Sequence, residues 1–206
     1  MLYRVIDENN NIIGTTEYFT PINEPSKKKI ALVVGHDSKK QGAYGDAGIS
    51  EYRFNSELIQ AIRVQCQNLN IKVFYRDENI KGYTNQMIDL HRRLDKWGSD
   101  VSIEFHFNAS SDMSVNGNEV LYCSDKGKRV ASILDECLDS LPNRDRGVKK
   151  VTMEDNGGGF CCRGKSVCVI SEPFFAENQS SYVIGGEHRS LLINAYARFL
   201  RELNMS

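Results

Sequence analysis

Short apolar segments alternate with longer segments of helical periodicity along most of the chain. The short segments have the length of β-strands and are bounded by turn residues, whereas the longer ones carry apolar residues three or four positions apart. Strands that alternate with helices in this way predict an α/β fold, in which a sheet carries helices on its faces. The predicted strands are Ile30 to Val34, Ile71 to Tyr75, Val101 to Phe107, Asn118 to Cys123 and Val167 to Ser171, and the predicted helices begin at Glu51, run from Thr84 to Trp97, and cover Val130 to Leu141 and Leu191 to Leu203.

The first 28 residues differ in pattern from the rest. Leu2 to Ile6 and Asn11 to Gly14 flank an acidic, asparagine-rich turn, which predicts a β-hairpin. Thr20 to Lys29 then contains two prolines, a serine and three lysines, a composition typical of a linker or an extended edge. We therefore expect residues 1–28 to form an N-terminal hairpin and linker, and residues 29–206 to form the main domain.

The segment from Asn143 to Lys165 is polar and rich in glycine, which predicts a loop with one short strand near Val148 to Val151. Its three successive glycines, residues 157–159, lack the lysine and the serine or threonine that follow the glycines of a phosphate-binding loop. We expect them to provide flexibility beside the functional site.

The charge balance and the cysteines narrow the class of protein. The 206 residues include 26 basic and 27 acidic side chains, a net charge of −1, so we expect no basic surface for nucleic acid or for an anionic membrane. No apolar run reaches the roughly 18 residues that membrane insertion needs, and Met1 to Asn10 lacks the apolar core of a signal peptide. Six cysteines are few for this length, and the adjacent pair Cys161-Cys162 suits free thiols, which predicts synthesis in a reducing cytoplasm. The sequence does not reveal the oligomeric state.

Two of the four histidines lie at the ends of predicted strands. His36 follows Ile30 to Val34 and a glycine, and His106 lies near the end of Val101 to Phe107. Two strands of one sheet that each deliver an imidazole can direct two neutral nitrogen ligands at one metal ion. For each histidine, the alternative is a structural role in which the imidazole is hydrogen-bonded to the backbone. With one carboxylate, the pair would leave a zinc ion with the open fourth position that hydrolytic zinc sites require.

Three glutamates are candidates for the acidic partners of these histidines. Glu51 begins the first predicted helix, after the loop behind His36, and is either the third ligand or a charge that stabilises the helix N-terminus. Glu172 follows the last predicted strand and precedes aromatic residues, surroundings that raise a carboxyl pKa toward that of a general base; the alternative is a surface acid before a turn. Glu104 shares a strand face with His106 and could orient its imidazole.

Several short motifs follow one another in a specific order between Lys29 and Leu203. They are Val33-Val34-Gly35-His36 with Gly42-Ala43-Tyr44-Gly45, Gly48-Ile49-Ser50-Glu51 with Asn55, Tyr75-Arg76-Asp77, Leu90 with Arg93, His106-Phe107-Asn108-Ala109, Gly117-Asn118-Glu119-Val120, Asn143 to Val148, and Glu172-Pro173-Phe174-Phe175 with Asn178. In order and spacing they resemble the amidase type 3 catalytic domain of zinc-dependent N-acetylmuramoyl-L-alanine amidases. The resemblance implies a single α/β domain with a twisted, mostly parallel but mixed sheet and helices on both faces.

The resemblance also implies the chemistry. His36, Glu51 and His106 would bind zinc, and Glu172 would be the catalytic carboxylate. The substrate would be peptidoglycan, cleaved at the amide that joins the lactyl group of N-acetylmuramic acid to L-alanine. Water activated by zinc would attack without a covalent intermediate.

Three positions depart from the pattern of this family. Asp37 to Gln41 stands where further glycines and an Asp-Pro-Gly turn are usual, Glu104 replaces a common serine, and Phe174 replaces a common glycine. None removes a ligand, so they bear on the shape of the groove and on which peptidoglycan is preferred. Besides Glu104, Asn108 and Arg93 lie in matching stretches and are candidates for contacts behind the ligands or to substrate.

Two other classes of function are compatible with these residues. One is a cell-wall-binding module that keeps the fold without catalysis, and the other is a zinc peptidase that cuts within the stem peptide. The missing signal peptide and the expected free thiols favour a phage-type endolysin, stored in the host cytoplasm and released to the wall at lysis. A bacterial autolysin is the alternative source.

Overall fold

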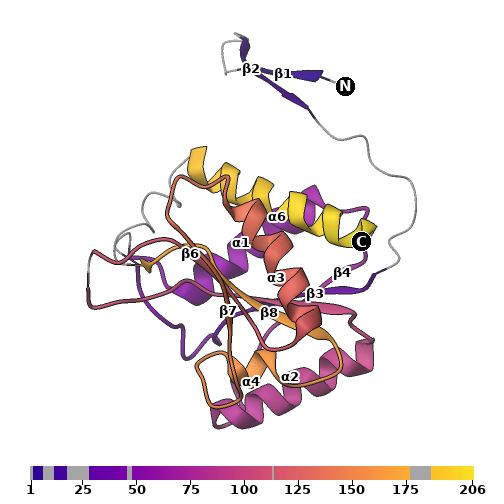
Figure 1. The fold of residues 1–206 in the computed structure, drawn as a ribbon, viewed down its shortest axis with the longest axis vertical. Helices are drawn as coiled ribbons and strands as arrows, with labels where there is room; N and C mark the ends of the chain where they lie inside the picture. Colours follow the sequence, from indigo (N-terminus) through magenta and orange to yellow (C-terminus); the bar gives the residue numbers. More distant parts are fainter. Residues whose placement is uncertain (1, 7–11, 18–27, 46–47, 113, 177–186) are drawn as a thin grey trace.

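A six-stranded sheet lies between two layers of helices (Figure 1). The structure, a computed structural model, describes residues 2–6, 12–17, 28–45, 48–112, 114–176 and 187–206. The α/β fold class predicted from the sequence is confirmed. The strands of the sheet are β3 (Ile30–Val34), β4 (Ile71–Phe74), β5 (Val101–Phe105), β6 (Asn118–Tyr122), β7 (Asp145–Lys150) and β8 (Val167–Glu172), and the helices are α1 (Glu51–Gln65), α2 (Tyr83–Trp97), α3 (Asp125–Leu138), α4 (Gly158–Cys161) and α6 (Glu187–Met205).

The strand order of the sheet is β4-β3-β5-β8-β6-β7. Neighbouring strands are parallel except β6 and β8, which are antiparallel, so the sheet is mixed and mostly parallel. The central strands β3, β5 and β8 run in one direction, and their carboxyl ends therefore meet at one edge. His36, His106 and Glu172 lie at this edge, where open α/β sheets place their ligand sites.

Each face of the sheet has its own apolar core. Helices α1, α3 and α6 cover one face, and α2 and α4 cover the other (Figure 1). Because helices shield both faces, β3 is buried along its whole length, which explains its uninterrupted apolar sequence. The buried Tyr196 of α6 shares a hydrogen bond of 2.7 Å with the Ser171 hydroxyl, so the last helix is tied to the strand that ends in Glu172.

The predicted N-terminal hairpin is present as a separate two-stranded antiparallel sheet. It consists of β1 (Leu2–Ile6) and β2 (Ile12–Glu17). The predicted linker falls largely on residues 18–27, outside the described residues, so the division at residue 28 stays a prediction. Within the described ranges, none of the helices is both long and apolar enough to cross a membrane.

The glycine-rich segment after β7 differs from the predicted flexible loop. It contains the four-residue helix α4, whose residues are buried. A Cβ on Gly159 would lie 2.6 Å from the ring of Tyr83, and one on Gly158 would lie 1.8 Å from the carbonyl oxygen of Thr152. These glycines therefore permit close packing against α2 and the preceding turn.

The expectation that all six cysteines are free thiols is wrong. Cys123 and Cys162 form a disulfide, with Cα atoms 5.4 Å apart. The adjacent Cys161 is a free thiol, which donates to the carbonyl oxygen of Leu121 at 3.6 Å. Because the pairing joins the ends of β6 and α4, which are distant in sequence, spacing along the chain does not reveal it. A reducing compartment therefore no longer follows from the cysteines. The free cysteines are Cys66, Cys137, Cys161 and Cys168, all buried.

Candidate active site

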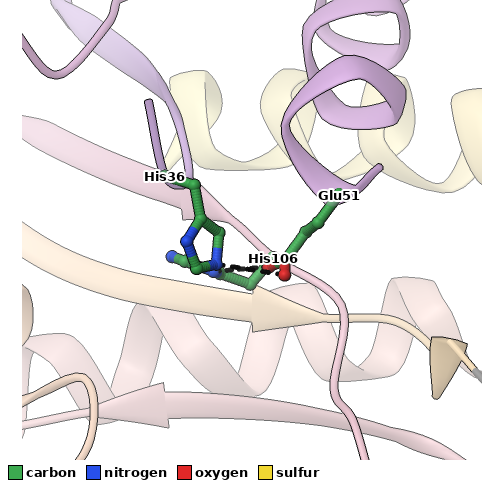
Figure 2. Close-up of side chains that lie close together, drawn as sticks. All are labelled: His36, Glu51 and His106. Atoms are coloured by element: carbon green, nitrogen blue, oxygen red, sulfur yellow. Dashed lines mark hydrogen bonds and ion pairs between the residues drawn. The ribbon is translucent and has the colours of Figure 1, made fainter. Parts of the chain in front are cut away.

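Three side chains from separate elements converge at the carboxyl edge of the sheet (Figure 2). His36 follows β3, Glu51 is the first residue of α1, and His106 follows β5. His36 Nε2 lies 3.0 Å from Glu51 Oε2, and His106 Nδ1 lies 2.7 Å from Glu51 Oε1. One ligand atom from each residue lies within 4.8 Å of the other two. The three residues expected to bind zinc are thus brought together.

The backbone around these residues makes room for them. His36 has a φ of 65°, a left-handed conformation that residues with a side chain rarely adopt. A Cβ on Gly35 would lie 2.6 Å from His106 Cε1, and one on Gly42 would lie 2.4 Å from Glu51 Oε2 and 2.5 Å from the His36 ring. Both glycines are therefore required for the backbone to pass this close to the three side chains.

This donor set suits zinc. Two imidazoles and one carboxylate leave an open fourth position, as in hydrolytic zinc sites. Ligand atoms of a tetrahedral zinc, bound at about 2.0–2.2 Å, lie roughly 3.3 Å from one another, close to the 3.0 and 2.7 Å between Glu51 and the imidazoles. Burial alone would raise the pKa of Glu51, but hydrogen bonds from His106 and His36 hold it well below its usual range. Glu51 is therefore anionic at neutral pH and available as a ligand.

A buried ion pair lies directly behind His106. The carboxylate of Glu104 is fully buried and accepts hydrogen bonds from Arg76 Nη2 at 2.6 Å and Nε at 3.0 Å. Its Oε2 lies 3.3 Å from His106 Nε2. The contact expected between Glu104 and the imidazole is present. Arg76, which follows β4, forms part of a matching motif, but its place in the site is visible only in the structure.

The two carboxylates make His106 basic. Burial by itself lowers the pKa of His106, but the charge of Glu104 and the hydrogen bonds to Glu104 and Glu51 raise it to about 10. A metal ion must therefore displace a proton from this imidazole. In the neutral tautomer with its proton on Nε2, the nitrogen beside Glu104, the Nδ1 lone pair would face Glu51 and could bind a metal ion.

Glu172 ends β8 beside the second histidine. Phe105 pairs with Ser171, and the N–H of His106 donates to the Ser171 carbonyl at 2.9 Å, so His106 and Glu172 are neighbours at the ends of adjacent strands. Burial raises the pKa of Glu172 to about 7; His106 opposes the rise and the charge of Glu119 adds to it. A carboxyl of this pKa can accept and return a proton near neutral pH, as expected for a general base.

A hydrogen-bonded network holds the Glu172 carboxylate. Asn108 Nδ2 donates to Glu172 Oε2 at 2.8 Å and to Glu119 Oε1 at 3.0 Å. Glu119 Oε2 accepts from Arg146 Nε at 2.6 Å and from the ammonium group of Lys149. Asn108 was a candidate from its motif, whereas the three charged residues were not singled out. A signal was present, because Glu119 and Arg146 lie in matching stretches.

The unusual segment after His36 is ordered by one carboxylate. Asp37 is buried, and its oxygens accept hydrogen bonds from the backbone N–H groups of Lys39 at 2.9 Å and Lys40 at 2.8 Å. They also accept one from the side-chain amide of Gln86 at 2.8 Å. The segment therefore forms a turn anchored to α2 beside the first histidine.

Two further predicted positions contribute to the surroundings of the site. Arg93 donates to Asp89 at 2.7 Å and to the Tyr75 carbonyl at 2.8 Å, so it holds the chain at the end of β4. Phe174, where the family commonly has glycine, is fully buried and stacks on Phe107 with ring centroids 5.1 Å apart. The Phe174 side chain therefore fills space in the apolar core next to the site.

The chain is similar in sequence and in fold to known proteins. Residues 30–184 match the family model described as N-acetylmuramoyl-L-alanine amidase. The catalytic domain of an endolysin targeting Clostridia difficile is 25% identical, with a TM-score of 0.69 over 86% of this chain and 97% of that one. An N-acetylmuramoyl-L-alanine amidase from Clostridium difficile 630 shares the fold, with 16% identity, a TM-score of 0.73, and coverage of 88% of this chain and 99% of that one. No curated protein matches by sequence. The family match spans more than half of the chain and includes all four predicted site residues, and the chain therefore belongs to the N-acetylmuramoyl-L-alanine amidase family.

Proposed function

We propose that this chain is a zinc-dependent amidase that hydrolyses the bond between N-acetylmuramic acid and L-alanine in peptidoglycan. One observation carries the proposal: His36, Glu51 and His106 converge beside Glu172, whose pKa is raised to about 7 by burial. An open zinc position next to a proton acceptor of this strength is the arrangement that hydrolysis by activated water needs. Membership of the family supports the choice of bond.

The zinc ion would be held by His36 Nε2, the Glu51 carboxylate and His106 Nδ1. Bound there, zinc would lower the pKa of its water from 15.7 toward about 7 and polarise the carbonyl of the scissile amide. Glu104 Oε2 lies 3.3 Å from His106 Nε2, so its charge favours a proton on that nitrogen and would leave Nδ1 free as the ligand. Arg76 balances the charge of Glu104 within the protein interior.

Glu172 would act as the general base and then as the acid. Its carboxylate takes a proton from the attacking water and returns it to the nitrogen of the departing L-alanine. Asn108 donates to Oε2 of this carboxylate and so restricts its orientation. The reaction needs no covalent intermediate, so the buried free cysteines have no part in it.

Two variants test these roles on purified peptidoglycan. Glu172→Ala should keep zinc and lose lysis, whereas His36→Ala should lose both. A Glu172→Ala protein with full activity would contradict the assignment of the base. Zinc content measured by mass spectrometry on both variants separates a lost ligand from a lost base.

Product analysis tests the bond. Digestion by the zinc-loaded protein should free the amino group of L-alanine and leave the glycan chain intact. New amino termini inside the stem peptide would instead identify a zinc peptidase. Sedimentation with walls that remain uncleaved would identify a binding module.

We also propose a lytic role of the phage-endolysin type. The similarity to an endolysin catalytic domain at 25% identity supports it. Cell fractionation tests it: the protein should stay in the cytoplasmic fraction until lysis begins. Accumulation in the wall fraction of intact cells would favour an autolysin.

A further inference from the structure

A second buried carboxylate lies beside the proposed base. Strand β6 runs antiparallel to β8, and the register of the pair places Glu119 directly opposite Glu172. Glu119 is only 6% exposed. Removal of a charged carboxylate from water costs several kcal/mol unless it is paired and hydrogen-bonded, so the partners of Glu119 explain how it is tolerated there.

Two cations from the edge strand β7 hold Glu119. Arg146 Nε donates to Glu119 Oε2 at 2.6 Å, and Lys149 Nζ binds the same oxygen. The Arg146 guanidinium also lies 5.2 Å from the ring centre of Phe175, which limits its movement. One carboxylate oxygen of Glu119 is therefore fixed by two charge-assisted contacts, and Oε1 is directed at Asn108.

The Asn108 amide connects the two carboxylates. Its Nδ2 donates one hydrogen to Glu119 and the other to Glu172, at 3.0 and 2.8 Å. Its Oδ1 accepts from the N–H of Ala109 at 3.0 Å, which defines the orientation of the amide. The backbone of Asn108 is held as well, because its N–H donates to the Phe174 carbonyl at 2.9 Å. The amide can therefore transmit the position of Glu119 to Glu172.

We propose that Glu119, anchored by Arg146 and Lys149, is a positioning residue that orients the Glu172 carboxylate through Asn108. The inference rests on the proposed function, because it takes Glu172 to be the base. Burial would raise the pKa of Glu119, but the bonds from Lys149 and Arg146 hold it below its usual range. Glu119 therefore stays an acceptor for Asn108, and its charge helps to raise the pKa of Glu172.

The principal test is Glu119→Gln in the full, zinc-loaded chain, assayed on a soluble N-acetylmuramoyl peptide. A glutamine keeps the size of the side chain but replaces one acceptor oxygen with a donor, which cannot bind the two cations and Asn108 together. We expect kcat to fall about 10- to 100-fold, with KM changed by less than about twofold and zinc content unchanged. The control is Glu136→Gln, which removes the same charge from an exposed position on α3 and should leave kcat unaltered.

A second variant covers the case in which Glu119→Gln fails to fold. Lys149→Met removes one of the two anchors at a side chain that is 40% exposed on the edge strand. It should lower kcat while KM and zinc content stay as in the unmodified protein. If Glu119 only joined β7 to β6, both variants would lose thermal stability and keep kcat, and this result would overturn the inference.

The kcat values of the variants distinguish failure of this inference from failure of the proposed function. If Glu172→Gln is inactive and both anchor variants keep wild-type kcat, Glu172 remains the base and Glu119 has no positioning role. If Glu172→Gln keeps wild-type kcat, the proposed function itself is wrong, whatever the anchor variants do.

Discussion

Replacement of Glu172 by glutamine separates what this residue does in catalysis from what it costs in stability. Glutamine has nearly the same shape, can accept from Asn108 and can donate toward Glu119. It removes only the negative charge and the ability to take up a proton. The metal-free protein should therefore become more stable at alkaline pH, and the zinc-loaded protein should become inactive.

The magnitude follows from the pKa of Glu172, which burial raises from 4.5 to about 7. Because the folded state holds this proton more tightly than the unfolded state, stability is lost as the pH rises from about 4.5 through 7. A rise of this size corresponds to about 3 kcal/mol, since one pKa unit is equivalent to 1.36 kcal/mol. We expect about 2 kcal/mol at pH 8, since the side chain keeps some contact with solvent. At pH 4.5 the difference should fall below about 0.5 kcal/mol.

Urea unfolding of both proteins after removal of metal, at pH 4.5 and pH 8, measures these differences. Glu172→Gln should have the higher unfolding free energy at pH 8 and nearly the same value at pH 4.5. Its activity after reloading with zinc should be lower by at least about 100-fold. A variant that is less stable than the unmodified protein at pH 8 would refute the reasoning about the buried charge, and one with normal activity would refute the role as base.

Three further predictions concern the metal site and the disulfide. Gly42→Ala should weaken zinc binding at least about tenfold, because its Cβ would lie 2.4 Å from Glu51 Oε2, as measured by competition with a chelator. Gly48→Ala is the matched control, since Gly48 has nearly the same φ, +72° against +75°, and nothing within 4 Å of an added Cβ; equal effects of the two changes would show that backbone strain alone is responsible. Removal of zinc should abolish activity reversibly. Zinc at 100 times its dissociation constant should raise the unfolding free energy by about 2.7 kcal/mol, as measured by calorimetry. A thermal unfolding midpoint that does not depend on zinc would contradict the metal site. Cys123→Ser should lower the unfolding free energy by about 2–4 kcal/mol, because the disulfide closes a loop over 39 residues. A reductant should lower the unfolding free energy of the unmodified protein by the same amount and should not change that of the variant.

The central elements could be predicted because their signals are local. The predicted strand Ile30 to Val34 coincides with β3, since a strand covered on both faces has an apolar side chain at every position. The helix predicted from Glu51 coincides with the start of α1, where Ser50 supplies the cap by accepting from the N–H of Arg53 at 3.3 Å. Helix α4 was missed because it is four residues long and rich in glycine, so only tertiary packing stabilises it.

The candidate site also contains residues whose positions the sequence could predict and residues whose positions it could not. The positions of His36, His106 and Glu172 could be predicted because each lies at the end of an apolar strand. Their roles as ligands and base stay predictions until metal and activity are measured. Glu119 lies in a matching motif, but its place beside Glu172 depends on β6 lying antiparallel to β8, which no local pattern encodes.

The sequence by itself determined the fold class, the strand ends that carry the histidines, and the family resemblance, because periodicity and motif spacing are properties of neighbouring residues. The tertiary structure alone decided which groups touch. It paired Cys123 with Cys162, placed Glu104 and Arg76 behind His106, and linked Glu119 to Glu172. The physical reason is that hydrogen bonds, ion pairs and disulfides act over a few ångströms. The partners come within this range only when the order and direction of all six strands are set, and that order results from packing of the whole domain.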